Sequence, residues 1–183
     1  MLKITVPACN QLWDEENEQF ISSPETVLEL EHSLVSLSKW ESKWCKPFIN
    51  RNDKTAEEMI DYVRCMTLNS NKVNNVVYSC LTEENVRQIN EYIEAPMTAT
   101  WFSKNSQSGS HSGEQITSEL IYYWMIALNI PFECQKWHLN RLLTLVRVCN
   151  IKNQPDKKMS RRETLSRNAA LNAARRKQLN TKG

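Results

Sequence analysis

The spacing of the apolar residues changes once along this chain, and that change restricts the fold class more than any other feature. Apolar and polar residues alternate from Leu2 to Val6 and again from Val27 to Glu31. Alternation is typical of half-buried strands, because successive side chains point to opposite faces. From Ser33 onward apolar residues recur three or four positions apart, which is helical spacing. The sequence therefore predicts an α+β protein that is mainly α.

The β part is expected to be a small N-terminal hairpin or meander. An acidic, turn-like stretch around Asn17 precedes Gln19–Ile21, which we expect to pair with the first strand. Residues 27–31 form the expected third strand, with Leu28 and Leu30 on the same side.

Helical patterns and capping signals account for most of the remaining chain. Thr55 and Glu58 have the spacing of a capping box, and Thr82 begins another acidic first turn. The polar run SKNSQSGSHSG at 103–113 predicts a flexible loop. The expected helices cover residues 33–46, 55–66, 82–95, 115–129 and 131–150.

Charge divides the chain into an acidic body and a basic tail. Residues 1–150 hold 13 Lys and Arg against 19 Asp and Glu, whereas residues 151–183 hold 10 against 2. We expect a compact domain at 1–150, mainly β over 1–32 and mainly α over 33–150. Residues 151–183 would form a linker and a helical or partly disordered tail, with helix-forming composition over 160–179.

The basic tail is the first candidate binding segment. Its candidate contacts are Lys157, Lys158, Arg161, Arg162, Arg167, Arg175, Arg176 and Lys177. Phosphate backbones and acidic protein surfaces both suit this charge, and a merely solvated tail is a third alternative. Because no aromatic residue follows Trp137, nucleic-acid binding would be electrostatic and sensitive to salt.

The sequence offers little support for catalysis. With three glycines in all, the chain has no Gly-rich loop to cradle phosphates. The string Gly109–Gly113 has histidine where a nucleophile elbow needs serine. Cys134 and His138 lack further metal ligands, and nothing places Glu119 and Glu133 around a shared cleft. We therefore predict a protein that is not an enzyme, with no cofactor and no metal.

Four tryptophans at helical spacing form the second candidate binding feature: Trp40, Trp44, Trp124 and Trp137. They suit either an aromatic groove or an ordinary core, and the sequence alone leaves both open.

Cysteine usage and apolar runs bear on the compartment. The six cysteines form no CxxC pair, which favours reduced thiols in a cytosolic chain. The N-terminus has no signal-like apolar region, and the run Leu120–Leu128 is too short to cross a bilayer. We expect neither export nor membrane insertion.

Three blocks of the chain resemble a known family. They are ELIYYWMIALNIPFECQKWHLNRLLTLVRVCN at Glu119–Asn150, NAALNAARRKQLNTKG at Asn168–Gly183 and LELEHSLVSLSKWESKW at Leu28–Trp44. In these blocks the chain is similar to tail assembly chaperones of siphophages, tailed bacteriophages of Gram-positive hosts. The family has no active-site motif to carry over.

The resemblance implies a non-enzymatic factor that binds the tape measure protein, keeps it soluble and helps tail tube subunits to gather around it. Such a protein acts in the host cell cytoplasm and is absent from the mature virion. The four tryptophans would then contact the client. The alternative is a structural, neck or packaging protein of a phage that contacts nucleic acid or virion proteins through its basic tail. Oligomeric state, including a homo-oligomer, and a longer frameshifted product stay open.

Overall fold

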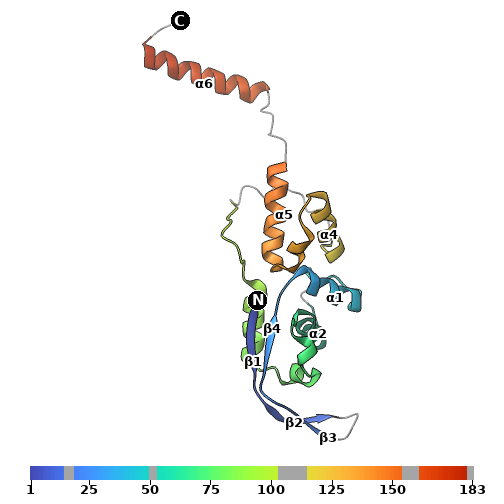
Figure 1. Cartoon of the computed structure of the whole chain (residues 1–183). Coiled ribbons are helices and arrows are strands. Elements are labelled where there is room, and N and C mark those ends of the chain that lie inside the picture. Colours follow the sequence, from blue (N-terminus) through green and yellow to red (C-terminus); the bar gives the residue numbers. More distant parts are fainter. Residues whose placement is uncertain (15–18, 50–52, 103–114, 154–160, 181–183) are drawn as a thin grey trace. The chain divides into compact units, whose positions relative to one another are not determined.

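The chain folds as a mainly helical α+β protein with a small antiparallel β element at its N-terminus (Figure 1). The computed structural model describes residues 1–14, 19–49, 53–102, 115–153 and 161–180. The chain divides into two compact units, Met1–Cys149 and Asn150–Gly183.

Strands β1 (Leu2–Val6) and β4 (Thr26–Leu30) form an antiparallel pair whose inner face belongs to the core. Ile4 lies opposite Leu28, and both are buried. On the outer face Lys3 Nζ lies 2.6 Å from Glu29 Oε1. The predicted alternation, including Leu28 and Leu30 on one side, is confirmed.

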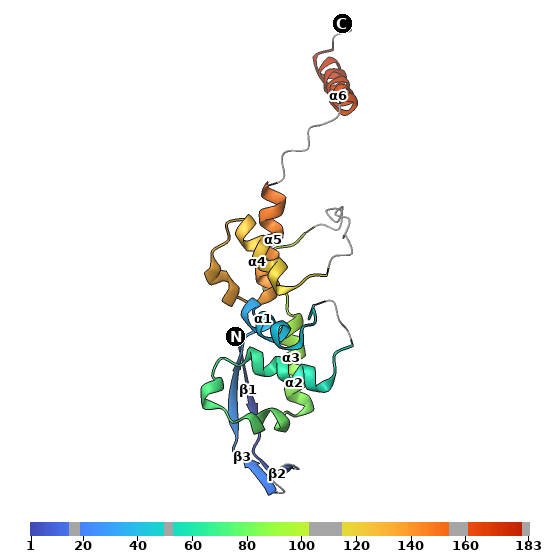
Figure 2. The same cartoon turned by 90° about the vertical axis from the view of Figure 1, so that its right-hand side faces the viewer.

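The predicted strand pairing is wrong, because Gln19–Ile21 does not pair with the first strand. These residues lie in β3 (Gln19–Ser23), which pairs with β2 (Cys9–Asp14), a strand that the apolar pattern did not predict. The β2–β3 hairpin lies below the β1–β4 pair, at the bottom of both views in Figures 1 and 2. A break in register between Cys9 and Leu12 interrupts the pairing, and such an irregularity hides a strand from pattern analysis.

Three helices follow the strands, and each begins with a capping box. Helix α1 (Leu34–Trp44) starts at Ser33, α2 (Ala56–Met66) at Thr55 and α3 (Glu83–Glu94) at Thr82. In each capping box two side chains satisfy backbone amides that lack helical partners. α1 packs against α2 and α4, whereas α3 packs against β1.

The chain between α2 and α3 contains two 3₁₀ helices, η1 (Ser70–Lys72) and η2 (Asn75–Cys80). Helix α4 (Ser118–Ala127) is the next helix among the described residues.

The helix predicted over 131–150 is wrong at its start. The structure instead has a 3₁₀ helix, η4 (Phe132–Lys136), then an extended Trp137, and then α5 (Leu139–Asn153). The helix is interrupted because the backbone N–H of Leu139 does not bond within a helix. It donates instead to the carbonyl of His32 at 2.7 Å. At its other end α5 runs three residues past the predicted boundary.

One core joins the inner face of the β1–β4 pair to the helices of the first unit. Leu34, Leu37 and Trp40 on α1 are wholly buried, as are Tyr62 and Met66 on α2. All six cysteines are free thiols. No helix in the described ranges is both long and apolar enough to cross a membrane.

The buried carboxylate of Glu41 connects three segments of this core. Its Oε1 accepts from the backbone N–H of Phe48 at 2.9 Å, and its Oε2 accepts from that of Ser118 at 2.7 Å. We expect Glu41→Gln to destabilise the fold by about 1–3 kcal/mol, because an amide has one acceptor oxygen and leaves a buried N–H unpaired. Urea unfolding of both proteins at pH 7.5 measures this difference; equal midpoints would contradict it.

Helix α6 (Arg161–Leu179) belongs to the second unit. Every side chain of α6 that the structure describes is exposed, including its three leucines. A helix with no buried face depends on propensity and local pairs for its stability.

Candidate functional site

The two tryptophans predicted on the first helix belong to the α1–α2 contact. Trp40 is wholly buried, and its Nε1–H donates to the carbonyl of Glu58 at 2.8 Å. Trp44 stacks on Trp40 with ring centroids 6.2 Å apart, and its Nε1–H donates to Asp61 Oδ2 at 2.9 Å. Trp40 therefore offers no surface to a partner, and Trp44 offers only part of its ring.

The other two predicted tryptophans are half-buried in the segment from α4 to η4. Trp124 lies on α4. Trp137 directly follows η4, and the Arg141 guanidinium lies 4.2 Å from its ring centroid. Exposed apolar side chains lie in the same segment: Tyr123, Ile126 and Phe132. A helix that is apolar on every side normally buries all of it, so this exposed face is a candidate contact surface.

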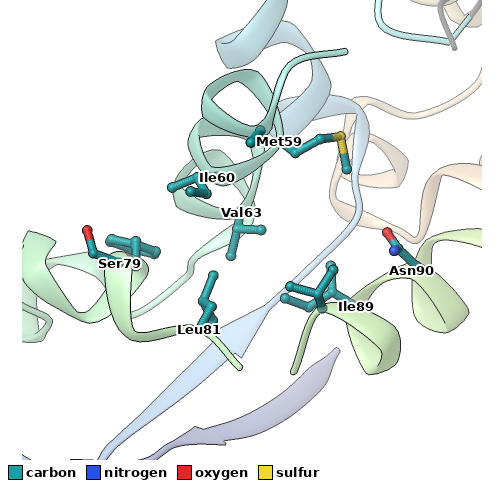
Figure 3. A pocket seen from close by; sticks show the side chains of 10 residues that line it. Met59, Ile60, Val63, Ser79, Leu81, Ile89 and Asn90 are labelled. Atoms are coloured by element: carbon teal, nitrogen blue, oxygen red, sulfur yellow. The ribbon is translucent and has the colours of Figure 1, made fainter. Parts of the chain in front are cut away.

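A cavity of about 380 Å³ opens between α2, η2 and α3, and we call it the α2–α3 groove. One wall comes from α2 through Met59, Ile60 and Val63. Figure 3 shows Ile89 and Asn90 of α3 across from them, with Leu81 between Val63 and Ile89 in this view and Ser79 on the side away from α3. Ala56, Tyr78 and Val86 complete the lining.

The α2–α3 groove has a buried base and an accessible rim. Val63 and Ile89 at its base are almost completely buried, whereas Val86 exposes 45% of its surface. The ten described residues that line the groove include no Asp, Glu, His, Lys, Arg or Cys. These side chains suit binding by apolar contact and offer no acid–base pair.

The capping boxes fix the two walls of the groove relative to the core. Thr55 and Glu58 hold the start of α2, and Lys46 Nζ pairs with Glu58 Oε1 at 2.5 Å. On the other wall Asn85 accepts from Thr82 N–H in the α3 cap and donates to the carbonyl of Thr5 at 3.1 Å. The cavity is therefore lined by anchored helices.

The sequence predicts the helices over 55–66 and 82–95 that form the walls, but it does not predict the groove between them. No tryptophan lines the groove. One feature of the sequence could have indicated it. The apolar stripes of α2 and α3 lie on short helices, and the segment that joins these helices has no clear apolar periodicity.

A second feature is a buried cluster of two histidines and two tyrosines. His32 Nδ1 and the Tyr62 hydroxyl are 2.5 Å apart, and the His32 and His138 rings have centroids 5.1 Å apart. Tyr92 packs edge-on against His138 and donates its hydroxyl to Glu31 Oε1 at 2.7 Å. The cluster joins the entry to α1, α2, α3 and the start of α5.

Burial keeps both histidines neutral. Desolvation, assisted by the nearby His138 ring, lowers the pKa of His32 to about 3. Desolvation also lowers the pKa of His138, against the opposing effect of the hydrogen bond to the Tyr92 carbonyl. His138 Nδ1 accepts from the Asn140 N–H, so Nε2 is the nitrogen that donates to Tyr92 O at 2.9 Å.

The hydrogen bonds of His138 argue against the metal site considered for Cys134 and His138. Both ring nitrogens of His138 already have hydrogen-bond partners within the protein. In the part of the chain that the structure describes, no group of three or more His, Cys, Asp or Glu could hold a metal ion. Glu119 and Glu133 are both exposed.

The remaining predicted site residues lie in two regions. Gly109–Gly113, Lys157 and Lys158 fall outside the described residues. Arg161 begins α6, and the other predicted tail contacts are exposed along the same helix: Arg162, Arg167, Arg175, Arg176 and Lys177.

No protein-family model, no curated protein and no solved structure matches this chain.

Proposed function

We propose that this chain is a non-enzymatic assembly chaperone of a tailed bacteriophage, which binds an apolar helical segment of the tape measure protein in the α2–α3 groove. It would keep that client soluble in the host cytoplasm while tail tube subunits gather, and it would be absent from the mature virion. The client's identity rests on the resemblance of the three sequence blocks.

The observation that carries the proposal is the apolar groove itself. Its lining comes from two neighbouring helices and holds no ionisable carboxylate, imidazole, amine or thiol among the described residues. Grooves of this kind accept the apolar face of an amphipathic helix through anchors at positions i, i+3, i+4 and i+7. A long apolar helical client needs such cover, since its exposed stripe would otherwise aggregate.

The helices that form the groove also carry charge that favours solubility while an apolar client is held. Glu83, Glu84 and Glu91 on α3 are exposed, and so is Glu57 on α2. None of these carboxylates lines the groove.

The test compares two valine variants of the full chain. Val86→Asp places a charge at the groove rim, whereas Val27→Asp makes the same change on β4, away from the groove. The two valines are matched in exposure, at 45% and 47%. We expect the unaltered chain and Val27→Asp to raise the soluble yield of the co-expressed tape measure protein of the same phage severalfold, and Val86→Asp to lose most of that gain.

Two outcomes would contradict the proposal. An unchanged soluble yield with the unaltered chain removes the chaperone function. Equal support from both variants removes the groove as its site and leaves the exposed α4 surface of Tyr123, Ile126 and Phe132 as the place to examine.

A further inference from the structure

Helix α6 carries exposed positive charge with no burial of its own. Arg162, Arg167, Arg175, Arg176 and Lys177 are all exposed. Leu165, Ala169 and Leu179 lie on one side of α6, but Arg162 and Arg176 fall on the same side at about 100° per residue, so no continuous apolar face forms. The charge, and not an apolar face, is therefore the feature that a partner would recognise.

The five charges surround the helix axis. At about 100° per residue, their positions leave no gap wider than about 100° around the helix. Arg162 and Lys177 point to one side, and Arg167 and Arg175 point to roughly the opposite side. A partner that neutralises all of them must carry negative charge on more than one side of the helix.

The distribution of positive charge around α6 distinguishes between the polyanions that could bind it. A membrane surface or an acidic protein face is one-sided, and membrane-surface helices also have a continuous apolar face. Single strands are bound through aromatic stacking, and α6 contains no aromatic residue. The major groove of A-form RNA is too narrow for side chains to enter. The major groove of B-form DNA admits an α-helix and has phosphates along both walls.

We propose that α6 is a sequence-independent binding helix for double-stranded DNA, which lies in the major groove with its arginines on the phosphates of both walls. The 19 residues of α6 span about 28 Å at 1.5 Å per residue, the length of about eight base pairs. This activity is independent of the α2–α3 groove and goes beyond client binding.

The first experiment measures the affinity of the full chain for a fluorescent 20-base-pair duplex of arbitrary sequence. Five neutralised phosphates predict a slope of about −4.5 for log K against log salt. Affinity should then fall by about 10²–10³-fold between 50 and 200 mM NaCl. No binding at 50 mM NaCl, or binding that salt does not weaken, overturns the proposal.

The second experiment tests whether both sides of α6 contact DNA. One variant carries Arg162→Gln and Lys177→Gln, and the other carries Arg167→Gln and Arg175→Gln. Each should make the salt slope shallower by about 1.8, because each removes two phosphate contacts. The matched control, Lys39→Gln with Lys136→Gln, removes two exposed lysines outside α6 and should leave the slope unchanged.

Glutamine has a helix propensity close to those of arginine and lysine, and circular dichroism of the variants verifies that α6 persists. Loss of affinity in only one pair would point to a one-sided anionic surface and overturn groove binding. Equal or tighter binding to a single strand of the same length, or to vesicles of anionic lipid, would overturn it as well.

Discussion

Replacing Trp40 with alanine is expected to destabilise the fold by about 3–5 kcal/mol. The side chain is wholly buried, stacks on Trp44 and meets Phe48 edge-on with centroids 5.0 Å apart. Its removal leaves a cavity at the α1–α2 contact and takes the indole N–H from the Glu58 carbonyl. Urea unfolding followed by circular dichroism measures the change in the free energy of unfolding.

Trp101→Ala is the matched control for this prediction, because Trp101 is 93% exposed. We expect that variant to stay within about 0.5 kcal/mol of the unaltered chain. A loss below about 1.5 kcal/mol for Trp40→Ala, or equal losses for the two variants, would show that Trp40 is not part of the core.

Acidification below pH 6.5 is expected to destabilise the first unit before its carboxylates protonate. The unfolded chain holds His32 at its ordinary pKa near 6.5, whereas the folded chain lowers that pKa to about 3. Between these values the unfolded state binds more protons, so stability is fully present above pH 6.5 and falls as the pH falls. The expected loss is about 1.4 kcal/mol per pH unit from His32, or about 2–3 kcal/mol by pH 4.5.

His32→Gln identifies the source of this pH dependence. Glutamine stays neutral and can still hydrogen-bond to Tyr62, so the variant should lose stability less steeply between pH 6.5 and 4.5. His138→Gln should also flatten the profile, because burial lowers the pKa of His138 in the same direction. Unfolding free energies at pH 7.5, 6.5, 5.5 and 4.5 decide the question. Profiles that run parallel to that of the unaltered chain would assign the acid sensitivity to other groups.

Residue type alone did not predict which side chains line the groove. Tryptophans are common at interfaces, which is why four of them were candidate contacts. Trp40 is in the core because helical spacing places it beside Leu37 on the buried side of α1, and α2 supplies a carbonyl for its indole. The α2–α3 groove is lined instead by aliphatic side chains, whose pattern is the same whether a helix face is covered or left partly open.

Local sequence determined several of the helices and strands, and the charge of the final segment. The alternation at Leu2–Val6, the capping boxes at Thr55 and Thr82, and the charge of the final segment each depend on residues a few positions apart, and short-range chemistry fixes them. Tertiary structure decided the pairing of β1 with β4, the break between η4 and α5, and the opening between α2 and α3. Those outcomes depend on contacts between residues distant in the sequence, such as Leu139 N–H on the His32 carbonyl, which no local pattern encodes.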